Sequence, residues 1–347
     1  MDGNPINYSI MKKLKYIFIL LVLLTSCQNK DLTFPDYKYN GVYFPLQYPL
    51  RTLVLGDSRS DNSLDKNLQF HIGVSIGGMY ENKKSWNVEY MLDTTLVPSN
   101  LTTSAGDTLK VLPPAYFTLS PLNNVIIPAG SFDGLILVQL TDAFLDDPLA
   151  VKGDYVIPLR ITGSTADSIL RGVPAVSNPN KNIASDWDAS ASPKDFVLFG
   201  IKYINPYHGS YFHRGKDITL SAAGDTLSTV VYHQQYVEND QLWKLTTTGR
   251  TTVETNGVGS QFSSNTELTL DIDSSGTINV KPVTTSALQA KGVGKYVKNS
   301  EIWGGTKNNA MYLNYIYKNG TLNHVVTDTL VFRDNGVVFE QFSVKLN

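Results

Sequence analysis

Cysteine is almost absent from this 347-residue sequence, since Cys27 is the only one. A single cysteine cannot form an intramolecular disulfide, so the fold must be stabilised by its hydrophobic core. Charge is also scarce: Lys, Arg, Asp and Glu make up 17% of the residues, and the formal net charge is −2 at pH 7. Lysine and arginine form no basic block, which argues against nucleic acid as a partner. No apolar run reaches the roughly 20 residues that a membrane-spanning helix needs.

Motifs for catalysis and for metal binding are missing as well. The sequence contains neither a Gly-x-Ser-x-Gly nucleophile elbow nor a glycine-rich phosphate loop. The histidines show no His-x₃-His or Cys/His spacing, so they predict no structural zinc site. The segment Asp271–Gly276 resembles the first half of a calcium loop, but Pro282 stands where a bidentate Glu is needed, and a hairpin turn is the better interpretation. We therefore expect no cofactor, no metal and no catalytic residues.

The N-terminal segment predicts export. Lys12, Lys13 and Lys15 precede the apolar run Tyr16–Leu24, which is typical of a secretory signal peptide. The following Leu24-Thr25-Ser26-Cys27 resembles the lipobox of bacterial lipoproteins, which implies removal of residues 1–26 and acylation of Cys27. An ordinary cleaved signal with Cys27 near the junction by chance is the alternative. Residues 27–39 are polar and predict a tether between the lipid and the first domain.

Period-2 alternation dominates the rest of the first half. Leu68–Ile76, Trp86–Tyr90 and Tyr155–Ile161 each alternate apolar with other residues, as half-buried strands do. About seven such strands between residues 40 and 163 predict an immunoglobulin-like β-sandwich. Residues 164–195 are rich in Pro, Ser, Asn and Asp and predict a linker or a long connection over the surface.

The second half, residues 196–347, predicts a different β architecture. Turn signals such as Ser275-Gly276 and Asn319-Gly320 separate alternating segments, and Asn-Gly favours tight hairpins. We expect eight to ten strands in an antiparallel meander that closes into a barrel, because closure removes exposed strand edges. No amphipathic helix is evident after the signal segment, so the predicted fold class is all-β.

Several short motifs between Gly41 and Ile161 resemble an N-terminal domain of unknown function common in Bacteroidetes surface lipoproteins. They are Val42-Tyr43-Phe44-Pro45, Gly77-Gly78-Met79-Tyr80-Glu81-Asn82, Leu112-Pro113-Pro114-Ala115-Tyr116, Ile127-Pro128-Ala129-Gly130-Ser131, Leu140–Pro148 and Tyr155–Leu159. In that family the domain is immunoglobulin-like. It precedes either a chitinase-like endo-N-acetylglucosaminidase barrel or a non-catalytic β domain of adhesin or glycan-binding lipoproteins. Lys202–Tyr211 and Asp328–Asp334 resemble the second, lipocalin-like partner.

The enzyme branch of that family does not fit this chain. Its catalytic strand ends in Asp-x-x-Asp-x-Asp-x-Glu, but here Leu268 replaces the first Asp and Ser275 replaces the general acid Glu. About 150 residues are also too few for a (β/α)₈ barrel of roughly 250 residues.

Sugar recognition remains as the candidate chemistry, since aromatic faces and polar side chains together bind pyranose rings. The candidate ligand-binding residues are Trp303, Trp243, Tyr207, Tyr211 and Arg214. Trp303 stands beside Glu301 and Gly304-Gly305, as expected for an exposed loop. Any of these aromatic residues could instead belong to the core.

The resemblance and the lipobox together imply a non-catalytic lipoprotein that is anchored in the outer membrane and exposed at the cell surface. We expect it to bind glycans, from the host or from dietary polysaccharide, or to act as an adhesin, within a polysaccharide-utilisation system. The alternative is a structural or assembly lipoprotein that binds a surface protein. An unrecognised glycoside hydrolase would need a carboxylate pair across a cleft. We expect a monomer.

Overall fold

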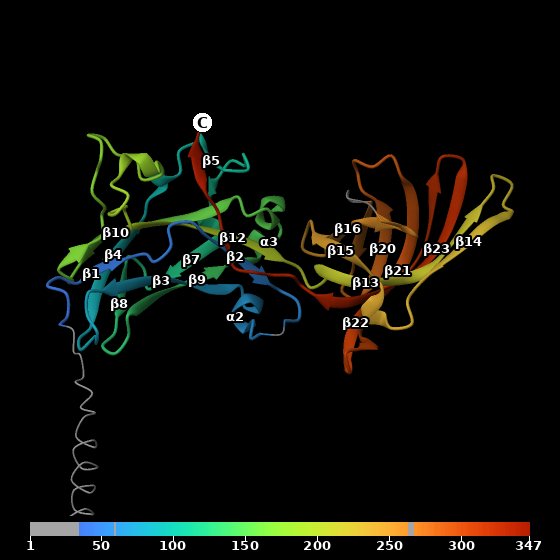
Figure 1. The fold of residues 1–347 in the computed structure, drawn as a ribbon, viewed down its shortest axis with the longest axis horizontal. Coiled ribbons are helices and arrows are strands. Elements are labelled where there is room, and N and C mark those ends of the chain that lie inside the picture. The colour runs from blue at the N-terminus through green and yellow to red at the C-terminus, as the bar shows by residue number, and fades with distance from the viewer. Residues whose placement is uncertain (1–34, 59, 263–266) are drawn as a thin grey trace, which may run out of the picture. The chain divides into compact units, whose positions relative to one another are not determined.

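The computed structural model describes residues 35–58, 60–262 and 267–347, so the signal peptide and Cys27 lie outside the described residues. Tyr39–Asn347 form one compact unit, in which strands dominate and helices are short (Figure 1). The prediction of an all-β fold is confirmed. No helix in the described ranges is long and apolar enough to cross a membrane. The helical pieces are α2 (Ser63–Lys66), α3 (Asp142–Leu145) and the 3₁₀ turns η1 (Thr94–Leu96), η2 (Pro114–Tyr116), η3 (Pro148–Val151), η4 (Ala184–Asp186) and η5 (Val237–Asn239).

Two sheets build the first half of this unit. The five-stranded sheet has the order β11 (Ser168–Ile169), β1 (Gly41–Tyr43), β3 (Gln69–Gly77), β9 (Asp133–Leu140) and β7 (Phe117–Ser120). The second has the order β24 (Glu340–Gln341), β2 (Pro49–Val54), β12 (Phe196–Ile204), β10 (Tyr155–Ser164), β4 (Trp86–Leu92) and β8 (Asn124–Ile127), with β6 (Lys110–Val111) on β10. Ile72 and Val138 of one sheet and Val88 and Leu159 of the other are completely or almost completely buried in a common core. The two sheets therefore form a β-sandwich, because each contributes its apolar face.

Strand pairing divides the chain differently from the boundary expected at residue 196. β12 pairs with β10 and with β2, so it belongs to the sandwich. Most of its side chains are buried on both faces, which suits a central strand better than a barrel wall. The C-terminal segment also returns to the sandwich, where β24 pairs with β2 and β25 (Val344–Leu346) pairs with β5 (Leu101–Thr103), as the red end of the ribbon shows in Figure 1.

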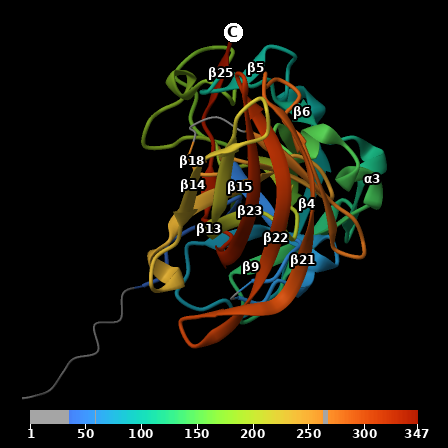
Figure 2. The same cartoon turned by 90° about the vertical axis from the view of Figure 1, so that its right-hand side faces the viewer.

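The second half is a closed eight-stranded barrel. Its strands are β13 (Gly209–Leu220), β15 (Gln241–Thr247), β16 (Thr252–Thr255), β19 (Leu268–Ile272), β20 (Thr277–Pro282), β21 (Gln289–Trp303), β22 (Thr306–Asn319) and β23 (Leu322–Asp334). All neighbours are antiparallel, and β23 closes the ring by pairing with β13 over most of its length (Figure 2). β14 (Thr226–Tyr232) extends one side of β13, and β17 (Gly257–Val258) and β18 (Gln261–Phe262) form a small separate hairpin. Closure pairs each of the eight barrel strands on both sides, and β14 remains as an edge strand outside the ring.

Candidate functional site

A groove lies at the end of the barrel where β21 turns into β22. We call it the Trp303 groove; it has a volume of about 730 Å³ and is lined by Asp57, Ser58, Ser60, Asn299, Trp303, Thr306, Lys307, Asn308, Asn309, Phe332, Arg333, Asp334, Asn335, Gly336, Val337 and Val338. Strand ends and the turns beside them supply these side chains. Such ends of barrels are common places for ligand sites.

Trp303 is held firmly in this groove. Its indole N–H donates a hydrogen bond to the carbonyl of Phe332 at 2.9 Å. Its ring packs edge to face against Phe212, with centroids 5.0 Å apart and planes at 78°. Gly304 and Gly305 follow with φ of 57° and 75°, a conformation that lets the chain turn directly after the tryptophan. The ring is therefore fixed before any ligand binds, while part of it stays exposed.

Amide side chains line the same groove. The Asn308 amide donates to the carbonyl of Thr306 at 2.9 Å, which keeps it beside the turn. The Asn309 amide donates to Asp57 Oδ2 at 3.2 Å, and its Oδ1 accepts from the backbone N–H of Asn299. Arg333 lies with its Nε 3.5 Å from Asp334 Oδ2. The groove thus combines one flat apolar surface with several hydrogen-bonding groups.

A second groove contains Tyr207. We call it the Tyr207 groove; it has a volume of about 470 Å³ and is lined by Leu55, Gly56, Asp57, Lys66, Pro206, Tyr207, Ser274, Ser275, Gly276, Tyr296 and Lys298. Tyr207 and Tyr296 meet edge to face, with centroids 5.0 Å apart and planes at 83°. Burial raises the pKa of both phenols, so both hydroxyls are neutral at physiological pH.

The remaining three candidate residues from the sequence lie elsewhere. Trp243 and Tyr211 are 1% and 0% exposed in the barrel core, so neither ring is available to a ligand at the surface. Trp243 stacks on His213 at a centroid distance of 3.8 Å, and the Tyr211 hydroxyl donates to the carbonyl of Tyr207. Arg214 forms an ion pair with Asp240 at 2.6 Å. The five candidates are therefore not brought together at one site.

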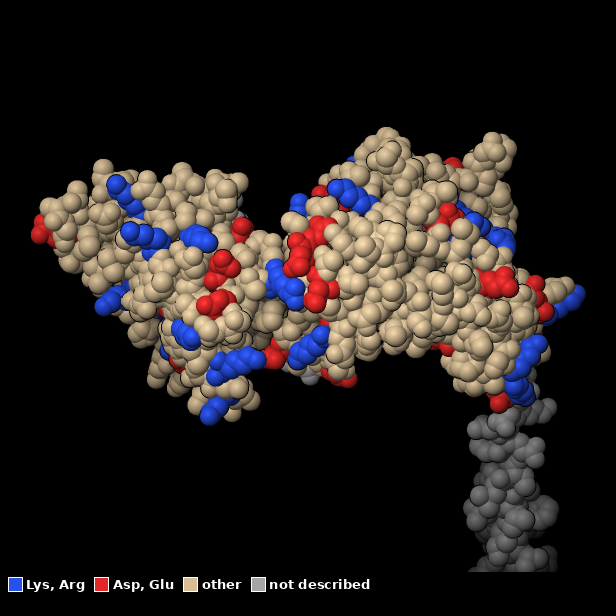
Figure 3. All heavy atoms as spheres, turned by 180° about the vertical axis from the view of Figure 1, so that it is seen from behind, with Lys and Arg blue, Asp and Glu red and all other residues tan. Residues whose placement is uncertain are grey.

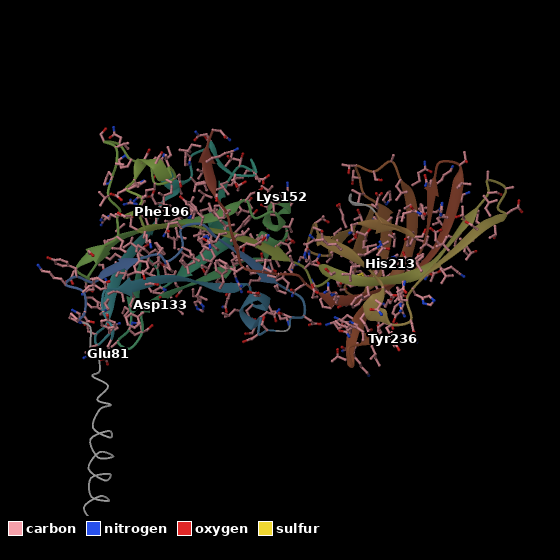
Figure 4. The ribbon with its side chains drawn as sticks, viewed as in Figure 1. Glu81, Asp133, Lys152, Phe196, His213 and Tyr236 are labelled. Carbon is pink, nitrogen blue, oxygen red and sulfur yellow. The ribbon has the colours of Figure 1, made fainter. Side chains whose placement is uncertain are left out.

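Sequence reasoning missed a cluster of polar side chains inside the barrel. Asp217 and Asp328 are each 1% exposed, and His213 beside them is labelled in Figure 4. Asp217 accepts hydrogen bonds from the Tyr317 hydroxyl at 3.0 Å and contacts His324 Nδ1 at 2.8 Å. Alternation along β13 and β23 would have placed both carboxylates on the inner face, because each stands an even number of residues from a buried neighbour.

The second carboxylate of this cluster is satisfied in the same way. Asp328 accepts from the hydroxyls of Tyr315, at 2.7 Å, and of Tyr232, and its Oδ1 lies 3.1 Å from His213 Nε2. Burial raises the pKa of Tyr315 and Tyr232, which keeps them as neutral donors. Within the described ranges no group of three or more His, Cys, Asp and Glu side chains could hold a metal ion. We interpret the cluster as structural, since its carboxylates face the barrel core and line neither groove.

Fold and site together define an all-β protein with a sandwich, a closed barrel and polar grooves at the barrel end. Residues 37–168 match a family of N-terminal domains, and residues 206–336 match the domain of unknown function DUF5627. A crystal structure of a Bacteroides ovatus protein of unknown function is 33% identical, with a TM-score of 0.81. The likeness covers 90% of this chain and 100% of that one. The chain belongs to the same family as that protein.

Two further structures from Bacteroides ovatus are more distant. One, of unknown function, is 14% identical over 88% of this chain and 100% of that chain, with a TM-score of 0.44. The other, a candidate carbohydrate binding protein, is 10% identical over 88% of this chain and 97% of that chain, with a TM-score of 0.26. The comparison with curated proteins found no match.

Proposed function

We propose that this protein is a non-catalytic glycan-binding lipoprotein of the cell surface and that the Trp303 groove is its binding site. One observation carries the proposal: a tryptophan ring is fixed by a hydrogen bond and by packing, yet remains partly exposed among amide side chains. Pyranose rings present an apolar C–H face that stacks on an aromatic ring, and their hydroxyls bond to amides and carboxylates. A site with one aromatic surface and a few oriented polar groups suits such a ligand.

The groove has a size appropriate to one or two sugar units. Its volume of about 730 Å³ lies within the range of roughly 300–1,000 Å³ that is usual for small-molecule sites. Its polar groups are already positioned by hydrogen bonds, from Asn308 to the carbonyl of Thr306 in the same strand and from Asn309 to Asp57 in the segment after β2. Preorganisation lowers the entropy cost of binding, which favours recognition by a surface of modest area.

Binding without catalysis agrees with the carboxylates of this groove. A glycosidase needs two acids across the bond to be cleaved, one of them in an environment that keeps it protonated. Asp57 is exposed and accepts a hydrogen bond from Asn309, and Asp334 lies beside Arg333. Both carboxylates of this groove thus already contact a neighbouring amide or cation, an arrangement that suits recognition of hydroxyl groups.

A second candidate function, binding of a protein partner, is favoured by apolar side chains beyond β23. Val338 and Phe339 are 70% and 69% exposed. They border an apolar groove of about 380 Å³ that also includes Leu50, Ile72 and Phe199. An adhesin could use this surface for a protein ligand, and the binding experiments distinguish the two candidates.

Substitution of the tryptophan tests the proposed function. The purified chain should be retarded in gels that contain host or plant polysaccharides, and Trp303→Ala should weaken the strongest interaction by about tenfold or more, as loss of an aromatic anchor does. Tyr236→Ala is the matched control, because Tyr236 is an aromatic residue that is 57% exposed and lines neither groove. Thermal unfolding of both variants checks that the barrel remains folded. Retardation that Trp303→Ala leaves unchanged would exclude this groove, and absence of retardation by every polysaccharide would exclude the function.

A further inference from the structure

We infer that the Trp303 groove and the Tyr207 groove form one extended site for an acidic oligosaccharide, a glycan that carries carboxylate or sulfate groups. The inference rests on the proposed function and goes beyond it by naming the class of glycan. Three features of the described residues support it: the two grooves adjoin, each has an aromatic surface, and their charged side chains are mainly cationic.

Asp57 connects the two grooves. It lines both of them, and the Asn309 amide of the Trp303 groove donates to its Oδ2 at 3.2 Å. The boundary between the grooves therefore includes a pair of hydrogen-bonded polar side chains, Asp57 and Asn309. An oligosaccharide could cross it while bonding to both side chains.

Each groove supplies its own stacking surface. Trp303 stands in one, and the edge-to-face pair Tyr207 and Tyr296 stands in the other. The grooves measure about 730 Å³ and 470 Å³, so each can hold at least one sugar ring. Two stacking surfaces on either side of a polar bridge favour a chain of sugars over a single one.

The charged side chains of the two grooves give the site its selectivity. Four are cations: Lys66 and Lys298 in the Tyr207 groove, and Lys307 and Arg333 in the Trp303 groove. The anions are Asp57 and Asp334, and each already has a cation close by: Lys66 Nζ at 3.9 Å and Arg333 Nε at 3.5 Å, respectively. The excess of positive charge contrasts with the formal net charge of −2 of the whole chain.

Two lysines in particular are available to an anionic ligand. Lys298 and Lys307 are exposed, and in the part of the chain that the structure describes neither forms an ion pair. Figure 3 shows one face of the molecule, on which uncharged residues cover much of the surface between scattered Lys, Arg, Asp and Glu side chains. A groove that carries charge of one sign raises the local concentration of oppositely charged ligands.

Matched polysaccharides test the inference on the intact chain. Two pairs are compared: dextran sulfate with dextran, and polygalacturonate with its methyl ester. The members of each pair differ only in the anionic group. We expect the anionic member of at least one pair to bind about tenfold more tightly at low salt and to lose most of that advantage in about 0.5 M sodium chloride. Which pair responds distinguishes sulfate from carboxylate.

Lysine variants and chain length localise the effect. Lys298→Ala and Lys307→Ala should each weaken binding of the anionic polysaccharide about three- to tenfold, whereas the control Lys318→Ala, an exposed lysine outside both grooves, should not. Affinity should also rise from a disaccharide to a hexasaccharide of the same series.

The possible results are distinguishable. Equal affinity for neutral and anionic members would overturn the inference but leave the proposed function in place. The inference would also be overturned if Lys318→Ala weakened binding of the anionic polysaccharide as much as Lys298→Ala and Lys307→Ala do. An affinity that did not rise from the disaccharide to the hexasaccharide would overturn it as well. Absence of binding to every polysaccharide would overturn both proposals.

Discussion

His208 illustrates how a single residue at the start of the barrel is fixed by its neighbours. Its Nδ1 accepts a hydrogen bond from the backbone N–H of Thr247 at 3.0 Å, so the ring is bound in its neutral form. Burial is the main cause that lowers the pKa of His208 to about 4, and the positive charges of Lys244 and Lys202 lower it further. The neighbouring Asn205 donates to the carbonyls of Gly249 and Thr252. The hydrogen bond between His208 and Thr247 therefore depends on an uncharged imidazole.

The first prediction concerns the pH dependence of stability. The pKa of His208 is about 4 when folded, against 6.5 for an ordinary histidine, so the unfolded chain binds the extra proton at intermediate pH. Stability from this residue is complete above pH 6.5, declines as the pH falls towards 4, and is constant below that. Between about pH 7 and about pH 5 the loss should be about 2 kcal/mol. Urea unfolding of the wild type and of His208→Asn, which keeps an acceptor but does not titrate, should differ by this amount in their pH dependence. Parallel curves for the two proteins would contradict the prediction.

At the same scale, the sequence predicts some side-chain environments better than others. Trp303 lies in a groove because Gly304 and Gly305 make a turn there, and that signal is local. Trp243 and Tyr211 have equally polar neighbours in the sequence, yet both are buried. Their environment depends on which face of a strand points into the barrel, and that face is defined by strands distant in the sequence. The partners of Asp217 and Asp328 are non-local for the same reason.

Two glycines allow close contact between the strands β21 and β22. A Cβ atom on Gly292 would lie 2.3 Å from Cβ of Tyr315, and one on Gly294 would lie 2.6 Å from Cδ2 of Leu313. Neither glycine has the positive φ that only glycine adopts readily, so space rather than backbone conformation explains these residues. The strands can approach because one of them lacks side chains at the contact.

The second prediction follows from this contact. Gly292→Ala should reduce the free energy of unfolding by about 2–3 kcal/mol, because the methyl group overpacks the barrel wall against backbone atoms as well as a side chain. Gly73→Ala is the control in β3, where the nearest atom to a new Cβ is Leu135 Cδ2 at 3.9 Å. That substitution should be neutral or stabilise by about 0.5 kcal/mol, since alanine costs less backbone entropy than glycine in a strand. If the two substitutions changed the free energy of unfolding in urea equally, the close contact at Gly292 would not be what makes glycine necessary there.

Elements were predictable from the sequence where their signals are local. Ser275-Gly276 joins β19 to β20 and Asn319-Gly320 joins β22 to β23, both as expected. Asn335-Gly336 has a similar signal but leads the chain out of the barrel to the sandwich. A turn motif defines a change of direction and not the next partner strand. The sequence also did not predict that β12 belongs to the sandwich, because its partners β10 and β2 cannot be identified from local signals.

At the scale of the whole molecule, the return of the C-terminal segment connects the end of the chain to its first domain. Phe342, Val344 and Leu346 pack on a small core that contains Leu101 and Phe196. The segment thus covers the face of the sandwich sheet that lies away from the main core. Alternation predicted the all-β class, but such pairings between residues far apart in the sequence leave no local pattern.

The last prediction concerns how the protein is held at the membrane. The proposal of a surface lipoprotein requires acylation of Cys27, which lies outside the described residues, because acyl chains anchor a protein through the burial of their methylene groups. In a bacterium with an outer membrane, the wild type should incorporate labelled fatty acid and fractionate with membranes. Cys27→Ser should do neither and should appear in soluble fractions, whereas Ser26→Ala, which keeps both a small residue and the cysteine, should behave like the wild type. Membrane association of the Cys27→Ser chain without incorporation of label, after removal of residues 1–26 has been verified by mass, would exclude a lipid anchor at this cysteine and would point to a protein partner that holds the chain at the membrane.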